Sequence, residues 1–351
     1  MAVSSVLGID IGSYAAKVVT LANLKGGRAT LQGLGMAQLP TDVVLNWEEE
    51  PIPAKTAIGQ AMKNLVTKNK LTGKYISTSL SGDSIVVKKI NMPIMSADDL
   101  KDAIAVEAEQ YIPFSINEVN LSHFVLDTMH DSGLMTVLLV AARKKVIQNY
   151  MDAMNFAKLR PAVIDIDGLA LCNAYEFTHP GNADDVILID IGANMLNIMV
   201  LNKGIPLVIK DEAGGGQYLT DEISVAFNMD MQDAEAVKFG SEAPPDPQKL
   251  KNIFDRLVGN WIAAVERVMD LSRNEDPDYR PRKMFLSGGS SLINGLADEF
   301  SQYFGLETTL FNPLLYTTYN TKKFDPDYIK YIGPQMAVSF GLALRKVEVQ
   351  Q

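Results

Sequence analysis

The chain has 351 residues, of which 47% are hydrophobic and 21% charged, and its formal net charge is -10 at pH 7. This length and composition are typical of a globular protein with two or more domains. No block of lysine and arginine offsets the acidic charge, so we expect no nucleic-acid partner. Cys172 is the single cysteine, which fits a reducing compartment. No stretch approaches the ~20 apolar residues of a membrane span, so we expect a cytoplasmic protein that meets a membrane only through a partner.

The first predicted element is a hairpin formed by strands at 6–10 and 15–22. Its first strand ends in Asp10-Ile11-Gly12, and the same phrase returns at Asp190-Ile191-Gly192. In both copies an apolar run precedes the phrase and another follows it, a pattern that predicts a buried strand, a tight turn and a returning strand. Two such turns facing each other could hold a metal-phosphate group. Their backbone N–H groups would bind phosphate oxygens, and Asp10 and Asp190 would bind Mg²⁺ through its water molecules.

The rest of the first half predicts a sheet covered by a helix. The apolar spacing between residues 54 and 70 is that of an amphipathic helix. We expect further strands at 31–38 and 75–80, a turn at 25–27 and a surface loop at 41–53.

Residues 85–160 predict a compact βαββα module. We expect its strands at 85–90, 119–128 and 135–142, and its helices at 96–111 and 144–158. About 75 residues suffice for an inserted domain. The alternative interpretation is a plain continuation of the first domain.

The second half repeats the hairpin and adds helices and glycine-rich turns. A run at 163–175 begins apolar, carries Asp165 and Asp167, and becomes helical. A helix at 217–227 follows the run Gly214-Gly215-Gly216. A strand at 284–286 leads into the turn Ser287-Gly288-Gly289-Ser290, and the two glycines of this turn would let a ligand approach the backbone. We also expect helices at 233–239, 249–271 and 334–346, with a loop-rich segment at 305–332.

These motifs together resemble the actin/Hsp70/sugar-kinase ATPase superfamily. They are the two Asp-Ile-Gly phrases, the Ser-Gly-Gly turn at 287–289, and the stretch Ala234-Glu235-Ala236-Val237-Lys238-Phe239-Gly240. The small module in place of the usual second subdomain resembles the FtsA-like branch. Its phrase Glu107-Ala108-Glu109-Gln110-Tyr111-Ile112-Pro113-Phe114 is similar to the type IV pilus assembly protein PilM family. The likeness covers essentially the whole chain.

The resemblance implies an α/β, actin-like ATPase fold of two lobes with an FtsA-like inserted βαββα subdomain. The implied divisions are a first lobe (1A) of 1–84, 161–182 and 336–351, an inserted subdomain (1C) of 85–160, a second lobe (2A) of 183–214 and 283–335, and its subdomain (2B) of 215–282.

The resemblance also implies a site for ATP and Mg²⁺ between the lobes. Glu235 and Lys238 match the pair that reaches the ribose and adenine, and Asp165 or, preferably, Asp167 lies near the segment that positions the attacking water. The other implied nucleotide-binding residues are Asp10, Gly12, Ser13 and Lys17 in the first loop region, Asp190, Gly192, Ala193 and Asn194 in the second, and Gly214, Gly215, Gly288, Gly289 and Ser290.

The implied function is that of an ATP-binding adaptor at the cytoplasmic face of the inner membrane, in the type IV pilus assembly platform. It would bind the N-terminal cytoplasmic tail of a bitopic PilN-like protein in a groove of the inserted module, for which we expect strand 85–90 to contribute. Other platform proteins and motor ATPases are further candidate partners, and the sequence leaves homo-oligomerisation open.

One departure from the family pattern bears on catalysis. Relatives carry small hydroxyl residues just after Asp-Ile-Gly, whereas here only Ser13 does, among Ser13-Tyr14-Ala15-Ala16 and Ala193-Asn194-Met195-Leu196. Fewer side-chain donors leave less charge stabilisation for phosphoryl transfer, so we expect at most a weak ATPase. The alternatives are a phosphotransferase of the sugar-kinase type, for which the sequence reveals no substrate pocket, and an FtsA- or MreB-like filament-forming ATPase.

Overall fold

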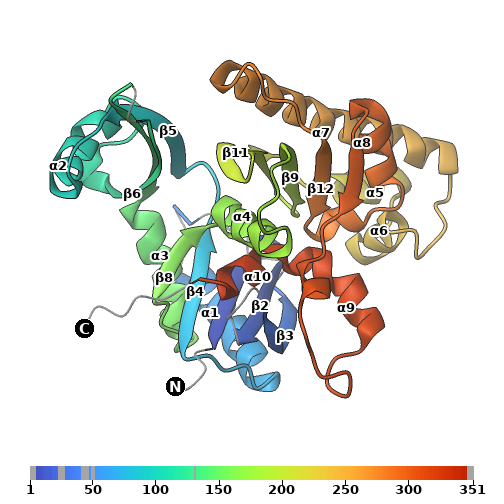
Figure 1. The fold of residues 1–351 in the computed structure, drawn as a ribbon. Coiled ribbons are helices and arrows are strands. Elements are labelled where there is room, and N and C mark those ends of the chain that lie inside the picture. Colours follow the sequence, from blue (N-terminus) through green and yellow to red (C-terminus); the bar gives the residue numbers. More distant parts are fainter. Residues whose placement is uncertain (1–4, 23–27, 41–46, 49–51, 130–131, 346–351) are drawn as a thin grey trace.

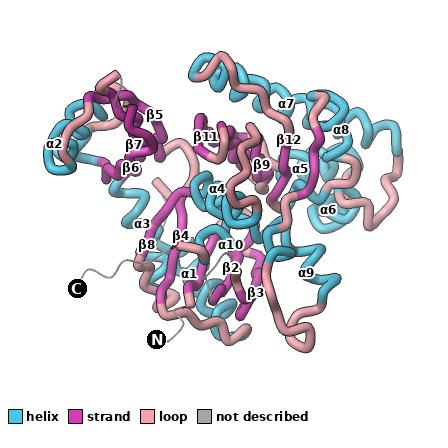
Figure 2. The backbone as a smooth tube through the Cα atoms, viewed as in Figure 1, coloured by secondary structure: helices cyan, strands magenta, loops and turns pink. Residues whose placement is uncertain are grey.

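The computed structural model describes residues 5–22, 28–40, 47–48, 52–129 and 132–345 (Figure 1). Within these residues, strands form two five-stranded sheets and one three-stranded sheet, and helices cover them (Figure 2). The fold is therefore α/β, as predicted. The predicted turn at 25–27 and most of the predicted loop at 41–53 lie outside the described residues.

The first five-stranded sheet contains the predicted hairpin. Its order is β3-β2-β1-β4-β8, with β1 antiparallel to β2 and parallel to β4. Helix α1 covers it with Ile58 and Met62, which are fully buried. The elements are β1 (Val6–Ile11), β2 (Ala15–Ala22), β3 (Thr30–Gln38), α1 (Ile52–Lys68), β4 (Tyr75–Leu80) and β8 (Val163–Ile166).

The second five-stranded sheet repeats this topology, with the order β11-β10-β9-β12-β13. Strands β11 and β13 were missed in the sequence, because β11 is only partly buried and opens with Ile205-Pro206. The duplication itself was the overlooked signal, since β3 and β8 hold the matching positions in the first sheet. The strands are β9 (Val186–Ile191), β10 (Met195–Asn202), β11 (Ile205–Ala213), β12 (Lys283–Ser287) and β13 (Glu307–Leu310).

Helices cover the second sheet around the buried Trp261. They are α5 (Gln217–Phe227), α6 (Met231–Lys238), α7 (Pro247–Glu275) and α8 (Leu296–Phe304). Helix α6 begins two residues before the predicted start, and α7 extends beyond 249–271 at both ends.

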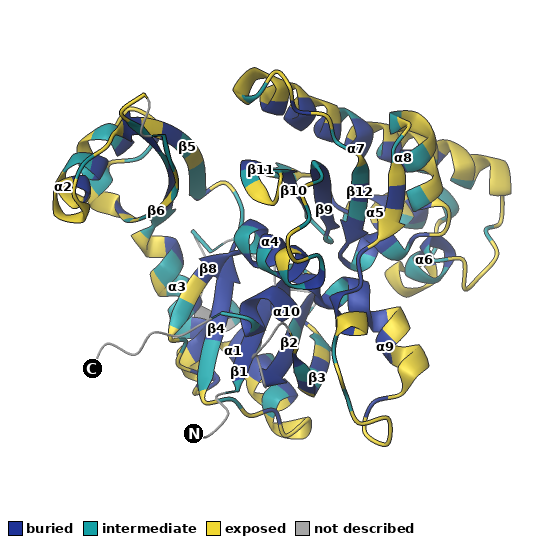
Figure 3. Ribbon diagram, viewed as in Figure 1, coloured by how far each residue is buried: buried dark blue, intermediate teal, exposed yellow. Residues whose placement is uncertain are grey.

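Helices α4 (Asp167–Thr178) and α10 (Ala337–Ala343) lie between the two large sheets (Figure 1). Leu21 of the first sheet, Leu188 of the second and Phe340 of α10 share one buried cluster, so the two sheets have a common core. Figure 3 shows both hairpins as buried strands beneath exposed outer helices. The predicted loop-rich segment also contains α9 (Pro326–Ile332), whose Asp325 side chain accepts a hydrogen bond from the Asp327 N–H. The aspartate followed by proline at 325–326 is a helix-start signal within this segment.

The inserted module has a sheet of its own, in the order β5-β7-β6, and its own core around Ile104 and Leu139. Its elements are β5 (Ile85–Pro93), α2 (Ala97–Ala108), β6 (Val119–Met129) and β7 (Leu134–Arg143). Helix α3 (Lys144–Phe156) was predicted to complete the module. Instead, its buried Tyr150 and Met154 pack in the cluster of α1 and the first sheet. The apolar face of α3 therefore packs against α1 and the first sheet rather than in the core of the module.

Candidate functional site

The two Asp-Ile-Gly turns have the same backbone geometry. The Gly12 N–H donates to the Ala15 carbonyl at 3.2 Å, and the Gly192 N–H donates to the Met195 carbonyl at 2.9 Å. Both aspartates are buried, with 5% of Asp10 and 8% of Asp190 exposed. The strand pairing sets Lys17 opposite Asp10, and Asn197 opposite Asp190.

The first turn carries an ion pair. Lys17 Nζ donates to Asp10 Oδ2 at 2.8 Å. Burial lowers the pKa of Lys17, but the carboxylates of Asp10 and Asp190 raise it more, so its pKa lies above the usual value and the amine stays charged. Burial raises the pKa of Asp190 to about 6, against the lowering effects of Lys17 and of the Ser287 hydroxyl, which donates to Asp190 Oδ2 at 2.8 Å.

Asp167 and Asp165 face different parts of the molecule. Asp167 opens α4 beside the Asp10 turn and accepts a hydrogen bond from the Ser79 hydroxyl. Burial and the nearby Asp10 raise its pKa to about 7, so it can take up or release a proton near neutral pH. Asp165 instead pairs with Arg345, whose Nε lies 3.0 Å from Asp165 Oδ2.

Several predicted glycines hold backbone segments together. A Cβ on Gly215 would lie 2.5 Å from the Ala193 carbonyl oxygen, and one on Gly288, whose φ is +86°, would lie 2.4 Å from that of Ile191. The Gly214 and Gly215 N–H groups both donate to the Asn194 carbonyl. These glycines therefore fasten neighbouring segments to the second turn. Gly289 differs, because its Cβ position meets only Gln335 Oε1, at 3.7 Å.

The Glu235–Lys238 pair lies at the junction of α5 and α6. Lys238 Nζ donates to Glu235 Oε1 at 2.5 Å, to Thr220 Oγ1 at 2.8 Å and to the Gly216 carbonyl at 3.3 Å. Burial lowers the pKa of Lys238, and Glu235 partly offsets that effect. Lys238 is thus hydrogen-bonded both to Glu235 and to the first turn of α5.

These groups line a cavity of about 330 Å³ between the two large sheets. The predicted site residues on its wall are Asp10, Gly12, Ser13, Lys17, Asp167, Asp190, Gly192, Ala193, Glu235, Lys238, Gly289 and Ser290. Four predicted residues are absent from the wall: Asn194, Gly214, Gly215 and Gly288. The wall also includes residues that the sequence did not predict: Tyr14, Met36, Asn197, Gln217, Tyr331 and Gln335. The tyrosines of the segment 305–332 were the available signal for Tyr331.

Two further hollows flank the inserted module. The β6–β8 hollow, of about 520 Å³, lies between the module and the first sheet and includes Phe124, Ile164 and Asn173. The β5–β11 hollow, of about 320 Å³, lies between the module and the second sheet and includes Lys88 and Lys210.

Comparison with known proteins supports the predicted fold and family. A family model described as type IV pilus assembly protein PilM matches residues 8–347. A structure of a PilM–PilN type IV pilus biogenesis complex is 27% identical, with a TM-score of 0.85, and covers 98% of this chain and 99% of that chain. Ethanolamine utilization protein EutJ from Carboxydothermus hydrogenoformans is 15% identical, with a TM-score of 0.56, over 97% of this chain and 89% of its own, and so shares the fold.

A further similar protein also supports the predicted fold. Cell division protein FtsA of Enterococcus hirae is 21% identical over 352 residues, which cover 88% of this chain and 78% of that protein. The predicted actin-like ATPase fold is thereby confirmed. Within the described residues, no helix is both long and apolar enough to cross a bilayer. The match across nearly the whole chain identifies it as a member of the type IV pilus assembly protein PilM family.

Proposed function

We propose that the protein binds ATP with Mg²⁺ in the cavity between its two large sheets and serves as an adaptor in type IV pilus assembly. The observation that carries the proposal is the convergence of two equivalent turns, each with a buried aspartate, on one cavity. Nucleotide bound there would contact both lobes and stabilise them in one arrangement.

The residues of the cavity fit a nucleotide phosphate chain. Backbone N–H groups after Gly12 and Gly192 would bind phosphate oxygens, and the charged Lys17 would offset the negative charge. Among the described residues, no group of three or more His, Cys, Asp or Glu could hold a metal ion. Mg²⁺ would therefore take most of its ligands from phosphate and water, with Asp10 and Asp190 binding those waters.

The same cavity favours slow hydrolysis. Asp167 would orient a water molecule, and its pKa of about 7 allows it to accept a proton. On the wall, the predicted phosphate and adenosine loops contribute three hydroxyl groups, those of Ser13, Tyr14 and Ser290. Donor groups aimed at the developing charge are therefore few, and we expect turnover far below the ~1 s⁻¹ at the lower end of typical enzymes.

Gly289 permits a direct test. Valine there would project into the cavity without meeting packed atoms, so Gly289→Val should abolish ATP binding in calorimetry while circular dichroism stays unchanged. Gly259→Val is the matched control, because Gly259 is exposed on α7 and no atom lies within 4 Å of its Cβ position. ATP affinity equal in the two variants would refute the site. Brisk phosphate release by the native protein would refute the adaptor role.

We also propose that the β6–β8 hollow binds the N-terminal cytoplasmic tail of a PilN-like protein, which would bring the chain to the inner membrane. The similar PilM was solved in complex with PilN. Strands β6 and β8 are the outermost strands of their sheets and border the hollow from both sides, so each offers free backbone groups to an extended chain.

Side chains of this hollow also suit a peptide. Phe124 is 67% exposed and Ile164 is 36% exposed, which leaves apolar surface for the tail to cover. Asn173 Nδ2 is buried and has no hydrogen-bond partner within the described part of the chain. A backbone carbonyl of the bound tail would satisfy this donor. Strand β5, expected from the sequence to form the groove, lies at the opposite edge of the module sheet.

Two equally exposed residues allow a matched comparison. A synthetic peptide with the N-terminal sequence of the PilN-like protein should bind the native chain in fluorescence anisotropy. Phe124→Glu should weaken binding by about tenfold or more, because it sets a charge in the apolar hollow. Val106→Glu, at an equally exposed position (67%) on α2 and outside the hollow, should bind like the native protein. Equal effects of the two substitutions would refute the assigned groove.

A second candidate function, phosphotransfer to a small molecule, is favoured by one observation. A hollow of about 490 Å³ shares Asp167 and Gly12 with the nucleotide cavity and is lined by Ser79, Ser81 and Tyr150. An acceptor hydroxyl there would lie beside a base. Acceleration of ADP formation by a polyol such as glycerol or glucose would favour this function, and an unchanged rate would exclude it for that acceptor.

A further inference from the structure

A further hollow, of about 410 Å³, lies at the edge of the first large sheet. Its wall is formed by residues of β2 and β3, by residues 70–72, which follow α1, and by the loop before α9 (Figure 1). The Leu31 N–H of β3 donates to the Thr318 carbonyl at 2.9 Å, and Lys323 Nζ donates to the Gln32 carbonyl. The loop before α9 is therefore fastened to β3.

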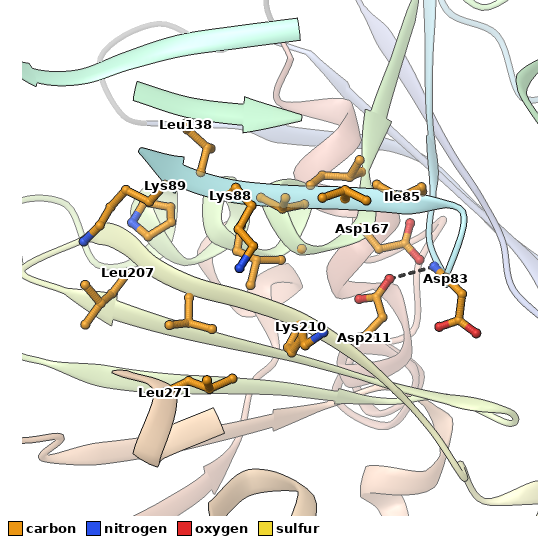
Figure 4. Close-up of a pocket in the computed structure, with 18 of the residues that line it drawn as sticks. Asp83, Ile85, Lys88, Lys89, Leu138, Asp167, Leu207, Lys210, Asp211 and Leu271 are labelled. Carbon is orange, nitrogen blue, oxygen red and sulfur yellow. Dashed lines mark hydrogen bonds between the residues drawn. The ribbon is translucent and has the colours of Figure 1, made fainter. Parts of the chain in front are cut away.

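Lysines without carboxylates distinguish this hollow from the four cavities described above. Lys70 and Lys323 line it, and no aspartate or glutamate lies on its wall. Each of the other four has carboxylates on its wall. In the β5–β11 hollow, Asp83, Asp167 and Asp211 lie among the lysines (Figure 4). We therefore refer to the hollow beside β3 as the basic hollow.

The sequence around the basic hollow has the same charge. Residues 11–41 and 51–82 hold eight lysines and arginines and no aspartate or glutamate, on a chain whose net charge is -10. Two of the eight, Lys17 and Lys55, are held in ion pairs. The others that the structure describes are exposed. This part of the first lobe therefore presents positive charge on an acidic protein, and it raises the local concentration of anions.

The two lysines of the basic hollow keep donors for a ligand. Within the described residues, neither Lys70 nor Lys323 forms an ion pair. Lys323 donates to one carbonyl, and an ammonium group has three N–H donors, so two remain. Asp325 is close to Lys323 in the chain, but its carboxylate accepts a hydrogen bond from the Asp327 N–H at the start of α9.

The basic hollow also holds a hydroxyl that lacks a partner. Thr20 lies on its wall, is only 1% exposed, and its Oγ1 has no hydrogen-bond partner in the described part of the chain. Gly33 is paired with Thr20 across the strands, and a Cβ at this glycine would lie 2.9 Å from Thr20 Oγ1. A larger residue would therefore press on the hydroxyl. Buried polar groups are normally hydrogen-bonded, so an acceptor oxygen of a ligand would satisfy Thr20.

We propose that the basic hollow binds the phosphate group of an anionic ester. Lys70 and Lys323 balance its charge, and the Thr20 hydroxyl donates to one of its oxygens. The ester is the headgroup of an anionic phospholipid or a soluble phosphate compound, since both carry this group. The basic hollow shares no residue with the nucleotide cavity, so the inference does not depend on nucleotide binding.

Two probes separate the sources of the phosphate. Glycerol 3-phosphate, measured by calorimetry, represents the soluble ester. Vesicles of equal parts phosphatidylcholine and phosphatidylglycerol, compared with phosphatidylcholine alone in co-sedimentation, represent the headgroup. Both are measured in the Gly289→Val background, in which valine fills the nucleotide cavity. Lysine-dependent binding of the anionic vesicles assigns the lipid headgroup, and lysine-dependent binding of glycerol 3-phosphate alone assigns a soluble ester.

A double substitution shows whether binding depends on the two lysines. Lys70→Asn with Lys323→Gln should weaken binding by about tenfold or more. Asparagine suits residue 70, whose φ is +50°. Lys158→Asn with Lys63→Gln is the matched control, because it makes the same charge change at exposed positions outside the hollow, and Lys158 has a φ of +60°. The control should bind within about twofold of the native affinity.

The buried hydroxyl has its own test. Thr20→Val keeps the shape of the side chain and should weaken phosphate binding by about threefold or more. It should not lower the free energy of unfolding in urea, because the hydroxyl has no partner to lose. Failure of both probes to bind, equal affinity of the Lys70/Lys323 variant and its control, or an unchanged affinity of Thr20→Val would overturn the proposal.

Discussion

The two hairpins share a backbone and differ in how their side chains are bonded. In the first, Asp10 pairs with Lys17 across the hairpin. In the second, Asn197 takes the place of Lys17 but donates to Asp211 on β11, and Asp190 is bonded by Ser287 of the adjacent strand. The first turn therefore supplies a positive charge to the cavity, whereas the second supplies hydrogen bonds that lead away from it.

The neighbouring strands show the same divergence. Ser287 lies next to Asp190 on β12 and donates to it. By the register of β1 and β4, Ser79 is the counterpart of Ser287, yet its hydroxyl donates to Asp167. Duplication thus preserved the strand geometry, and a few side-chain changes gave the halves different tasks: charge balance in the first, and linkage between lobes through Asp211 and Gly82 in the second.

Removal of the positive charge of Lys17, which is present only in the first hairpin, should have the largest effect on stability. Lys17→Met would leave the buried Asp10 without its partner, and the loss of one partner of a buried ion pair costs about 3–5 kcal/mol. Urea denaturation of the nucleotide-free protein should show this decrease in the free energy of unfolding. Lys63→Met, on the exposed side of α1, should change it by less than about 0.5 kcal/mol. A similar small change for Lys17→Met would show that the ion pair contributes little.

The pH dependence of stability should separate Asp190 from Asp167. Because burial raises the pKa of Asp190 from 3.8 to about 6, the folded state binds the proton of this carboxyl more tightly than the unfolded state does. The stability that results is full below pH 4 and is lost as pH rises through 6. The loss amounts to about 3 kcal/mol. Asp190→Asn should remove it from unfolding curves measured between pH 4 and 8. The contribution of Asp167, whose pKa is raised to about 7, should persist. Parallel curves for native and variant protein would contradict the assignment.

How much the sequence predicted depends on the kind of signal. Asp10 and Asp190 were predicted as a pair because the repeated phrase sets both the strand and the turn. The shared cavity followed from the duplication, and Asp167 lies on its wall with the hairpin residues. The family resemblance supplied Glu235 and Lys238, which no periodicity would have singled out. Local patterns that recur, or that match a known family, therefore predicted residues that line one cavity.

Tertiary packing explains what the sequence did not predict. Helix α3 follows β7 directly in the chain, so sequence proximity assigned it to the module, whereas its apolar face packs on α1. Gly215 and Gly288 looked like ligand-approach glycines, but they allow close contact with the backbone of the second turn. The hydrogen bond between Gly82 and Asp211 joins residues 129 positions apart, and no local pattern indicates such a contact.

Loss of the hydrogen bond between Asp211 of β11 and the Gly82 N–H of the first lobe should have the next largest effect on stability. Asp211→Asn would set an amide N–H₂ against either the Gly82 N–H or the Asn197 amide, at a cost of about 2 kcal/mol. The Gly82 amide should then exchange its hydrogen faster in the native state. Asp83→Asn, at the exposed neighbour of Gly82, should leave that exchange rate unchanged. Unaltered protection in Asp211→Asn would mean that the carboxylate does not hold the turn.

The smallest effect should come from the two counterpart serines. Ser79→Ala and Ser287→Ala each remove one buried hydrogen bond, so each should cost about 1 kcal/mol of unfolding free energy. Their electrostatic effects should differ. Both hydroxyls lower the pKa of the carboxylate to which they donate, so Ser79→Ala should raise the pKa of Asp167 and Ser287→Ala that of Asp190. NMR titration of the carboxyl carbons should show each shift at one aspartate. A shift of Asp190 in Ser79→Ala would mean that the halves share one hydrogen-bond network rather than two.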